Sequence, residues 1–233
     1  TTEIYTLSLH DALPISKSIE WLKKYLETEK LLPSQQVLKE KTDERFGILI
    51  QLGIRNLHDL QEALKNKDKV QQFSVRTGLP VDYLTILRRE VNSYHPQPRK
   101  ISDFPFIKAE VKEKLQTIDI KDTVSLFSHV ATQEEREKLI QKLNVTSEEV
   151  TTLAKAVDLM RIRYVNHTFA NLLIHSSYDT ISKIQKADYN KLYKELYALN
   201  ENQTYFTGHF GASDMELFIN DAKCFGSAIH LNE

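Results

Sequence analysis

The chain has 233 residues, of which 41% are hydrophobic and 27% charged, and its formal net charge is −1. This composition is ordinary for a globular protein and leaves enough chain to bury a sizeable core. No apolar run approaches the roughly 20 residues that a membrane helix needs, so we expect no membrane association. The near-neutral charge argues against a protein whose affinity depends on neutralising many phosphates.

The first residues, TTEIYTLSLHDALPIS, do not lead into the pattern that follows them. Thr1 to Ile15 correspond without a mismatch to the translation of a common short-read sequencing adapter. We interpret residues 1–16 as adapter-derived and leave them out of the fold prediction. His10 and Asp11 then have no functional role, and the native N-terminus is expected to be missing.

From residue 17 onward, apolar residues recur at spacings of three and four, as Ile19, Leu22 and Leu26 do. This is the period of an amphipathic helix, and long alternating strand patterns are absent. TSEE (146–149) and SDME (213–216) are typical helix starts, with a hydroxyl that can cap free N–H groups and acids in the first turn. The sequence therefore predicts an all-α protein of short helices.

The sequence also resembles itself. A shift of 66 residues without a gap brings Leu49 onto Leu115 and Ile54 onto Ile120, and a further shift of 58 brings Leu115 onto Leu173. Any helical protein matches itself at some apolar positions, but here the turns also stay in phase. We interpret the pattern as tandem repeats that stack into one array. The predicted segments are an N-terminal helical segment (17–42), repeat 1 (43–101), repeat 2 (102–162) and repeat 3 with a C-terminal helix (163–233).

Three stretches carry a resemblance to a known family: VDLMRIRYVNHTFANLLIHSSYDTI (157–181), TGLPVDYLTIL (77–87) and SDMELFINDAKCF (213–225). The chain resembles an uncharacterised bacterial and archaeal family of domains of unknown function with tandem helix-hairpin-helix-like, SAM-like helices. The resemblance covers most of residues 43–225. The matching residues of the first stretch are Asp158, Leu159, Arg161, Ile162, Ala170, Leu172, Leu173 and Thr180. The resemblance implies an array of such hairpins and, through the family's helix-hairpin-helix relatives, nucleic-acid binding.

A helix-hairpin-helix binds phosphate through backbone N–H groups at the start of its second helix, and its glycines allow close approach. Here the glycine positions hold other residues. We expect Asn166 to tolerate a left-handed conformation and Tyr164 to place a ring where a phosphate would come. The aligned pairs are Tyr164 and Asn166 in repeat 3, Phe106 and Lys108 in repeat 2, and Glu40 and Thr42 in repeat 1. The fold is therefore better supported than the binding of phosphate.

The best basic stretch is ILRREVNSYHPQPRK (86–100), in which cations flank Tyr94 and His95. Such a mixture can hold a single nucleic-acid strand. The simpler interpretation is a helix end whose dipole the cations complement, followed by an extended linker. The residues predicted to contact DNA or RNA in this alternative are Arg88, Arg89, Arg99, Lys100, Lys108, Arg161, Arg163 and Asn166.

Tyr189, Tyr193 and Tyr197 recur every four residues beside Leu192 and Leu196, so one helix face holds three rings. They form either a partner-binding stripe, because aromatic residues are enriched at interface centres, or ordinary core packing.

Catalytic and metal-binding motifs are missing from the sequence. Cys224 is the single cysteine, which excludes a disulfide framework and favours a reducing, cytoplasmic compartment. No HExxH pair, P-loop, nucleophile elbow or dinucleotide fingerprint occurs, so we expect no enzyme, no metal and no cofactor. The sequence predicts a non-catalytic binding or scaffolding module that acts through contacts with an unidentified protein partner. The alternative is weak, sequence-independent binding of DNA or RNA.

Overall fold

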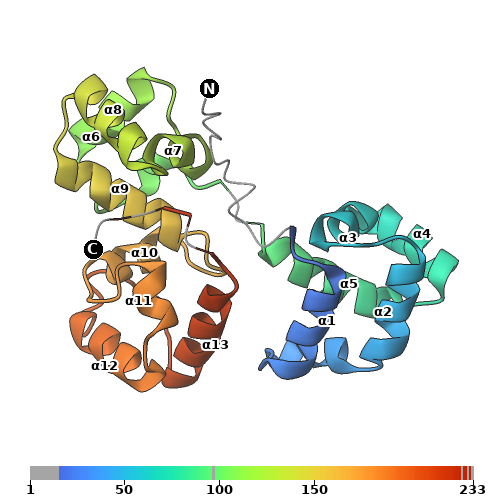
Figure 1. Cartoon of the computed structure of the whole chain (residues 1–233). Helices are drawn as coiled ribbons and strands as arrows, with labels where there is room; N and C mark the ends of the chain where they lie inside the picture. The colour runs from blue at the N-terminus through green and yellow to red at the C-terminus, as the bar shows by residue number, and fades with distance from the viewer. Residues whose placement is uncertain (1–15, 96–97, 227, 230, 232–233) are drawn as a thin grey trace. The chain divides into compact units, whose positions relative to one another are not determined.

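The computed structural model describes residues 16–95, 98–226, 228–229 and 231 (Figure 1). The stretch that we interpret as adapter-derived lies outside the described residues, apart from Ser16. The chain divides between His95 and Pro96 into two compact bodies. We call residues 16–95 the N-terminal body and residues 98–231 the C-terminal body, and describe each by itself. The expected boundary between repeats 1 and 2 lies shortly after this division.

Every regular element among the described residues is a helix, which confirms the predicted all-α fold. Extended contacts in this part of the chain are limited to two isolated bridges, Ser18 with Asn56 and Lys100 with Asp122. Within the same residues, no helix has the length and apolar character to cross a membrane.

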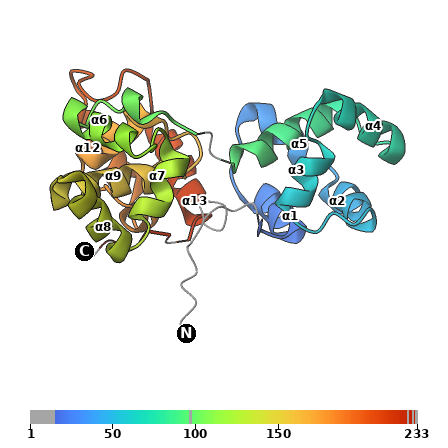
Figure 2. The ribbon, with the colours of Figure 1, turned by 90° about the horizontal axis from the view of Figure 1, so that it is seen from above.

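The N-terminal body contains α1 (Ile19–Thr28), the 3-10 helix η2 (Pro33–Lys39), α2 (Thr42–Gln51), α3 (Leu57–Ala63), α4 (Lys67–Thr77) and α5 (Val81–Ser93). Helix α5 packs against η2, α3 and α4, and Figure 2 shows α3 beside it. Its apolar residues at helical spacing, Leu84, Leu87 and Val91, are completely buried. Just after α5, the buried ring of Tyr94 meets the Trp21 ring edge-on at 5.7 Å.

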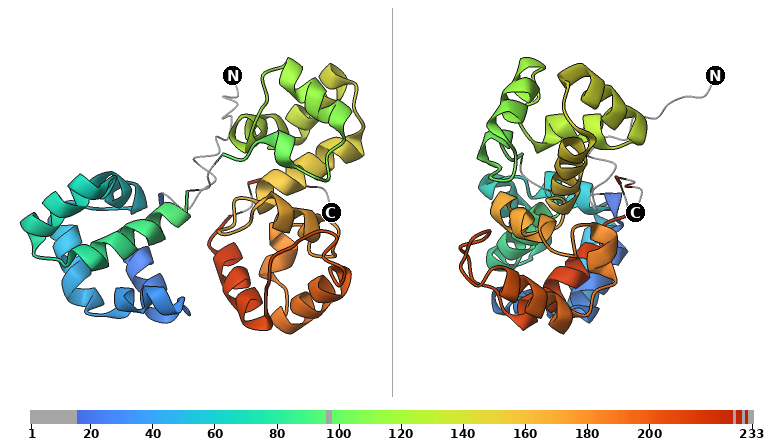
Figure 3. Two further views of the ribbon diagram at one scale, coloured as in Figure 1. Left: turned by 180° about the vertical axis from the view of Figure 1, so that it is seen from behind. Right: turned by 90° about the vertical axis from the view of Figure 1, so that its left-hand side faces the viewer.

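The C-terminal body is organised around α9. This helix packs against α7 and α8 on one side and α10 on the other, and Figure 3 shows it joining the two groups of helices. Because two layers cover it, residues on several of its faces are buried, including Ala154, Ala156 and Leu159. The elements are η3 (Ile101–Asp103), α6 (Ala109–Thr117), α7 (Thr123–Val130), α8 (Gln133–Leu143), α9 (Ser147–Leu159), α10 (His167–Ile174), α11 (Ile181–Gln185), α12 (Tyr189–Leu199) and α13 (Ala212–Lys223).

Capping side chains explain where most of these helices begin, although α2, α5, α6 and α13 have an N-cap residue without a capping side chain. Thr146 is the N-cap of α9 and forms a reciprocal capping box with Glu149, which confirms the helix start predicted at 146–149. The start predicted at 213–216 is displaced. Helix α13 begins at Ala212, and its N-cap is Gly211, whose N–H donates to Asp214 at 2.7 Å. A glycine has no side chain to cap with, so only the second half of a capping box is present, in which the carboxylate of Asp214 accepts the N–H of the N-cap residue.

Helices α2 to α5 and α6 to α9 have matching bounds when the first set is displaced by 66 residues: α4 falls on α8 at both ends. The left-handed residues also correspond, since Gly53 and Asp119 have φ of 84° and 64°. Each turn is closed in the same way, with Ile54 N donating to Leu49 O at 3.1 Å and Ile120 N donating to Leu115 O at 3.0 Å. The local backbone is therefore alike in both sets, although only one set has glycine at this turn.

Candidate functional site

The segment that follows α12, residues 201–211, is held in place by the side chain of Asn200. Its Oδ1 accepts the N–H groups of Tyr205 and Phe206 at 3.1 and 3.0 Å, and its Nδ2 donates to the Phe206 carbonyl at 2.7 Å. Asn171 Nδ2 donates to the Tyr205 carbonyl at 3.3 Å. Both asparagines are buried, so water competes little for these bonds, and they fix the directions of the two aromatic side chains.

Gly208 lets this loop fold onto itself. A Cβ atom at this position would lie 2.3 Å from the Phe206 ring, closer than any real contact. The ring therefore occupies the space that another residue's side chain would take. In that position its centroid lies 5.2 Å from the centroid of the core residue Phe169.

Aromatic rings lead from the core to the surface of the C-terminal body. Phe169, 8% exposed, contacts Phe206, Phe210 and Phe218 at centroid distances of 5.2, 6.0 and 5.5 Å. Phe210 meets the Tyr193 ring at 6.1 Å, and Tyr193 lies 5.7 Å from Tyr197. All of these contacts except the tilted pair of Tyr193 and Tyr197 are edge-to-face, an arrangement that holds a ring in a defined orientation.

We define the aromatic surface as Tyr189, Tyr193, Tyr197, Phe206 and Phe210. Tyr189 and Tyr197 are 39% and 60% exposed, whereas the other three are half-buried. Along the same helix Leu192 and Leu196 are completely buried. The core-packing interpretation thus describes the leucines of α12, while Tyr197 lies largely outside the core and Tyr189 is partly exposed. Lys191 and Lys194 are exposed on this helix too.

Two residues proposed to bind nucleic acid, Arg161 and Arg163, are buried inside the C-terminal body. Arg161 pairs with Asp158 and donates to the Gly226 carbonyl at 3.0 Å. Arg163 donates from Nε to Asp221 at 2.9 Å. Their charges are satisfied within the fold, which makes them unsuitable for contact with a phosphate group.

The other proposed cations are spread over both bodies. Arg88 and Arg89 lie in the middle of α5 in the N-terminal body, so its last turn holds no cation, and Arg88 donates to the Lys65 carbonyl at 3.0 Å. Arg99 and Lys100 are exposed in the C-terminal body. Lys108 is exposed as well and pairs with Glu149 at 2.8 Å. The basic stretch 86–100 is therefore not one surface of a single body.

The hairpin before α10 differs from the expected one. Tyr164 takes the left-handed conformation, with φ of 67°, and its ring is 65% exposed. Asn166 is extended instead, because it serves as the N-cap of α10 and its side chain accepts the N–H of Phe169 at 2.8 Å. The left-handed backbone that a glycine would adopt is thus present at a tyrosine, whose Cβ makes this conformation unfavourable.

The described residues contain no group of three or more His, Cys, Asp or Glu side chains placed to hold a metal ion. The aromatic surface itself lacks a nucleophile paired with a base. What it can do chemically is bury apolar area against another surface.

These features define an all-helical protein whose C-terminal body displays a preorganised aromatic surface. A family model described as a domain of unknown function, DUF4332, matches residues 105–223, about half of the chain and most of the C-terminal body. The chain belongs to this family. Comparisons with curated proteins and with solved structures found no match.

Proposed function

We propose that this protein is a non-catalytic binding or scaffolding module that contacts a protein partner through the aromatic surface. The observation that carries the proposal is the 60% exposure of Tyr197 at the end of a series of rings anchored in the core. Aromatic side chains are enriched at the centres of protein interfaces, where they bury large areas at low entropic cost. Because the rings are already packed against one another, they would lose little conformational entropy when a partner binds.

The position of the aromatic surface in the repeat supports this function. The matching bounds of α2–α5 and α6–α9 favour a duplication, and α10 and α11 begin 58 residues after α6 and α7. In that register α12 and α13 correspond to α8 and α9. Only residues 144–146 connect α8 to α9, whereas 200–211 connect α12 to α13. The connection 200–211, which holds Phe206 and Phe210, is therefore longer than the one that links the corresponding helices α8 and α9. Functional residues are commonly found on such loops.

A capture experiment tests the proposal. Full-length chain is immobilised and exposed to a cell extract, next to a Tyr189→Ser/Tyr197→Ser double variant. A Val75→Ser variant is the matched control, because Val75 is 87% exposed and lies in the N-terminal body. We expect wild type and control to retain the same protein and the double variant to lose it by about tenfold or more. Equal retention by all three would contradict the proposal.

Weak nucleic-acid binding is the second candidate, favoured by the left-handed backbone at Tyr164 directly before α10. This backbone is the one that a helix-hairpin-helix requires of its glycine. Fluorescence anisotropy with single- and double-stranded DNA and RNA tests it at low and physiological salt. Affinity that falls steeply with salt, and falls again in an Arg89→Ser/Arg99→Ser/Lys100→Ser variant, would support it. The absence of binding at low salt would remove it.

A further inference from the structure

A cavity of about 330 Å³ opens between the end of α3 and one face of α4 in the N-terminal body. Ala63 lines it from α3, and Lys69, Gln72, Phe73 and Arg76 line it from α4. The four α4 residues have the spacing i, i+3, i+4 and i+7, so they form one stripe along two turns of the helix. The cavity therefore has a cation at each end, with an aromatic ring and an amide between them.

Neither cation of this stripe is paired with a carboxylate of the described residues. Lys69 Nζ donates to the backbone carbonyl of Glu62 at 2.9 Å, which leaves its charge uncompensated and further N–H groups to donate. The Glu62 carboxylate pairs with Lys65 instead, at 3.2 Å. Arg76 donates no hydrogen bond within the described part of the chain, and its guanidinium carbon lies 5.1 Å from the centroid of the Phe73 ring. The two positive charges thus face the cavity without an opposing carboxylate in its lining.

Phe73 fixes the direction of Arg76. Its ring is only 4% exposed and belongs to the core of the N-terminal body. A guanidinium that lies over such a ring is attracted by the negative face of the ring. Because the ring is packed in the core, this contact holds the exposed Arg76 side chain at one end of the cavity.

The helical unit does not require these charges. In the register that places α4 on α8, the position of Lys69 holds Glu135, which pairs with Lys138 of the same helix at 2.8 Å. The position of Phe73 holds Leu139, which is equally buried. The corresponding helix therefore balances its own charges and packs with an aliphatic residue, so packing alone does not explain two unpaired cations beside a ring.

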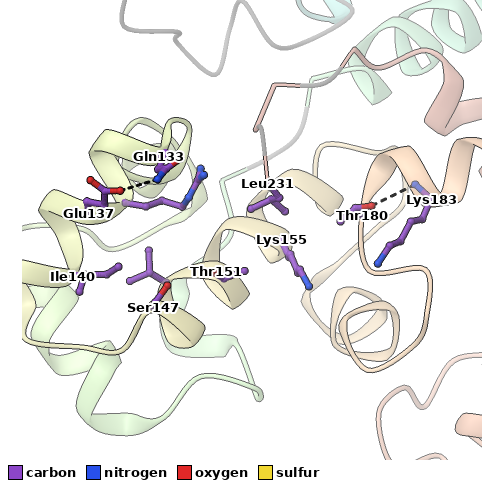
Figure 4. Close-up of a pocket in the computed structure, with 11 residues that line it drawn as sticks. Gln133, Glu137, Ile140, Ser147, Thr151, Lys155, Thr180, Lys183 and Leu231 are labelled. Carbon is purple, nitrogen blue, oxygen red and sulfur yellow. Dashed lines mark hydrogen bonds between the residues drawn. The ribbon is translucent and has the colours of Figure 1, made fainter. Parts of the chain in front are cut away.

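A larger cavity, of about 620 Å³, lies in the C-terminal body, and Figure 4 shows Lys155 and Lys183 in its lining. Both lysines pair with Asp179, at 2.6 Å for Lys183. Arg136 lines the same cavity and donates to the Val130 carbonyl at 2.8 Å. The cations of this larger cavity are thus engaged within the fold, in contrast to those on α4.

From this arrangement we infer that the cavity between α3 and α4 binds a short organic dicarboxylate. One carboxylate lies at Arg76, the other at Lys69, and the apolar middle of the ligand lies over Phe73 and Ala63. The planar fork of arginine matches a carboxylate through two parallel hydrogen bonds, and an ammonium group attracts the second carboxylate as a point charge. The two cations are two turns apart, about 10.5 Å along the helix, which favours negative groups at both ends of a ligand over one compact ion.

Isothermal titration calorimetry on the full-length chain tests the inference at constant ionic strength. The probes are succinate, adipate and suberate, whose carboxylates lie progressively farther apart, and hexanoate, which has the chain of adipate and only one carboxylate. We expect affinity to depend on the length of the dicarboxylate, and hexanoate to bind about tenfold or more weakly than adipate.

Variants assign the binding to the two cations. Arg76→Gln and Lys69→Gln should each weaken binding of the best dicarboxylate by about tenfold or more. Both residues are exposed, so the melting temperature should stay close to that of wild type. Lys67→Gln is the matched control, because it removes one charge from an exposed position of α4 that does not line the cavity, and it should leave binding within about twofold.

Each contrary outcome overturns the inference. Failure of the wild-type chain to bind any dicarboxylate at millimolar concentration removes the site. Equal losses in Lys67→Gln and Arg76→Gln would mean that only the overall charge attracts the probe. Hexanoate binding as tightly as adipate would exclude a role for the second cation. Inorganic phosphate binding as tightly as the best dicarboxylate would exclude recognition of two separate carboxylates.

Discussion

Arg163 and Asp221 form a buried ion pair that joins the hairpin before α10 to helix α13, with Nε of Arg163 2.9 Å from Oδ1 of Asp221. Each side chain is only 5% exposed. The neighbouring pair of Arg161 and Asp158 is buried as well. Removing both charges from water is costly, so such pairs fix one arrangement of the elements that they join.

Asp221→Ala should lower the free energy of unfolding by about 3–5 kcal/mol, because Arg163 would stay buried without its carboxylate. Urea denaturation followed by far-UV circular dichroism measures the change. Replacing both residues, as in Arg163→Met/Asp221→Leu, should recover most of the loss. Glu134→Ala, which breaks an exposed pair with Lys138, is the control and should change little.

The single tryptophan adds a local check on this prediction. Trp21 belongs to the N-terminal body, where its ring stacks with that of Tyr25 at 5.4 Å. Its fluorescence therefore reports on that body, whereas circular dichroism reports on both. If Asp221→Ala shifts the midpoint of urea unfolding equally in fluorescence and in circular dichroism, its effect is not confined to the C-terminal body.

Tyr164→Gly should raise the free energy of unfolding by about 0.5–1 kcal/mol. The tyrosine holds a left-handed backbone at φ of 67°, which glycine adopts without strain, and the gain exceeds the entropy that glycine adds to the unfolded chain. Thermal denaturation measures it. Tyr164→Ala removes the same ring and keeps the strain, so stabilisation of both variants alike would show that the backbone is not the cause.

Asn200→Ala should destabilise the C-terminal body by about 1–3 kcal/mol, because three hydrogen bonds that hold the 201–211 loop are lost. Near-UV circular dichroism should also lose signal from the aromatic rings, and partner capture should weaken. Asn202 is exposed in the same loop, so Asn202→Ala serves as the control. If Asn200→Ala keeps the near-UV spectrum, then Asn200 does not organise the aromatic surface.

The pair of Lys108 and Glu149 should give a dependence of stability on pH. The hydrogen bond from Lys108, helped by the N–H of Thr146, lowers the pKa of Glu149 from 4.5 to about 2. A carboxylate whose pKa is lower in the folded protein than in the unfolded chain stabilises the fold at any pH above the unfolded pKa. This contribution is lost as pH falls from 4.5 towards 2. Melting temperatures over this interval should fall less steeply for Glu149→Gln than for wild type; parallel curves would contradict the prediction.

Much of the fold could be predicted from the spacing of apolar residues and from capping motifs. The helical period and the TSEE box at 146–149 are local patterns, and local backbone preferences act on them directly. The start of α13 was harder to predict, because its N-cap residue is Gly211, which has no side chain. The N–H of Gly211 donates to Asp214, three residues later. The prediction for the hairpin before α10 was wrong in one detail, because the left-handed residue is Tyr164 and not Asn166. Asn166 is extended, since it serves as the N-cap of α10.

The sequence by itself determined the all-α class, the start of α9 and the three-tyrosine periodicity of α12, because these depend on neighbours within a few residues. Tertiary structure alone decided which side chains are accessible. It buried Arg161 and Arg163 against aspartates, left Tyr197 60% exposed, and placed Arg136 with two lysines from other helices around one cavity. These outcomes depend on contacts between residues as far as 65 positions apart, and the energy of such contacts exists only once the helices have packed.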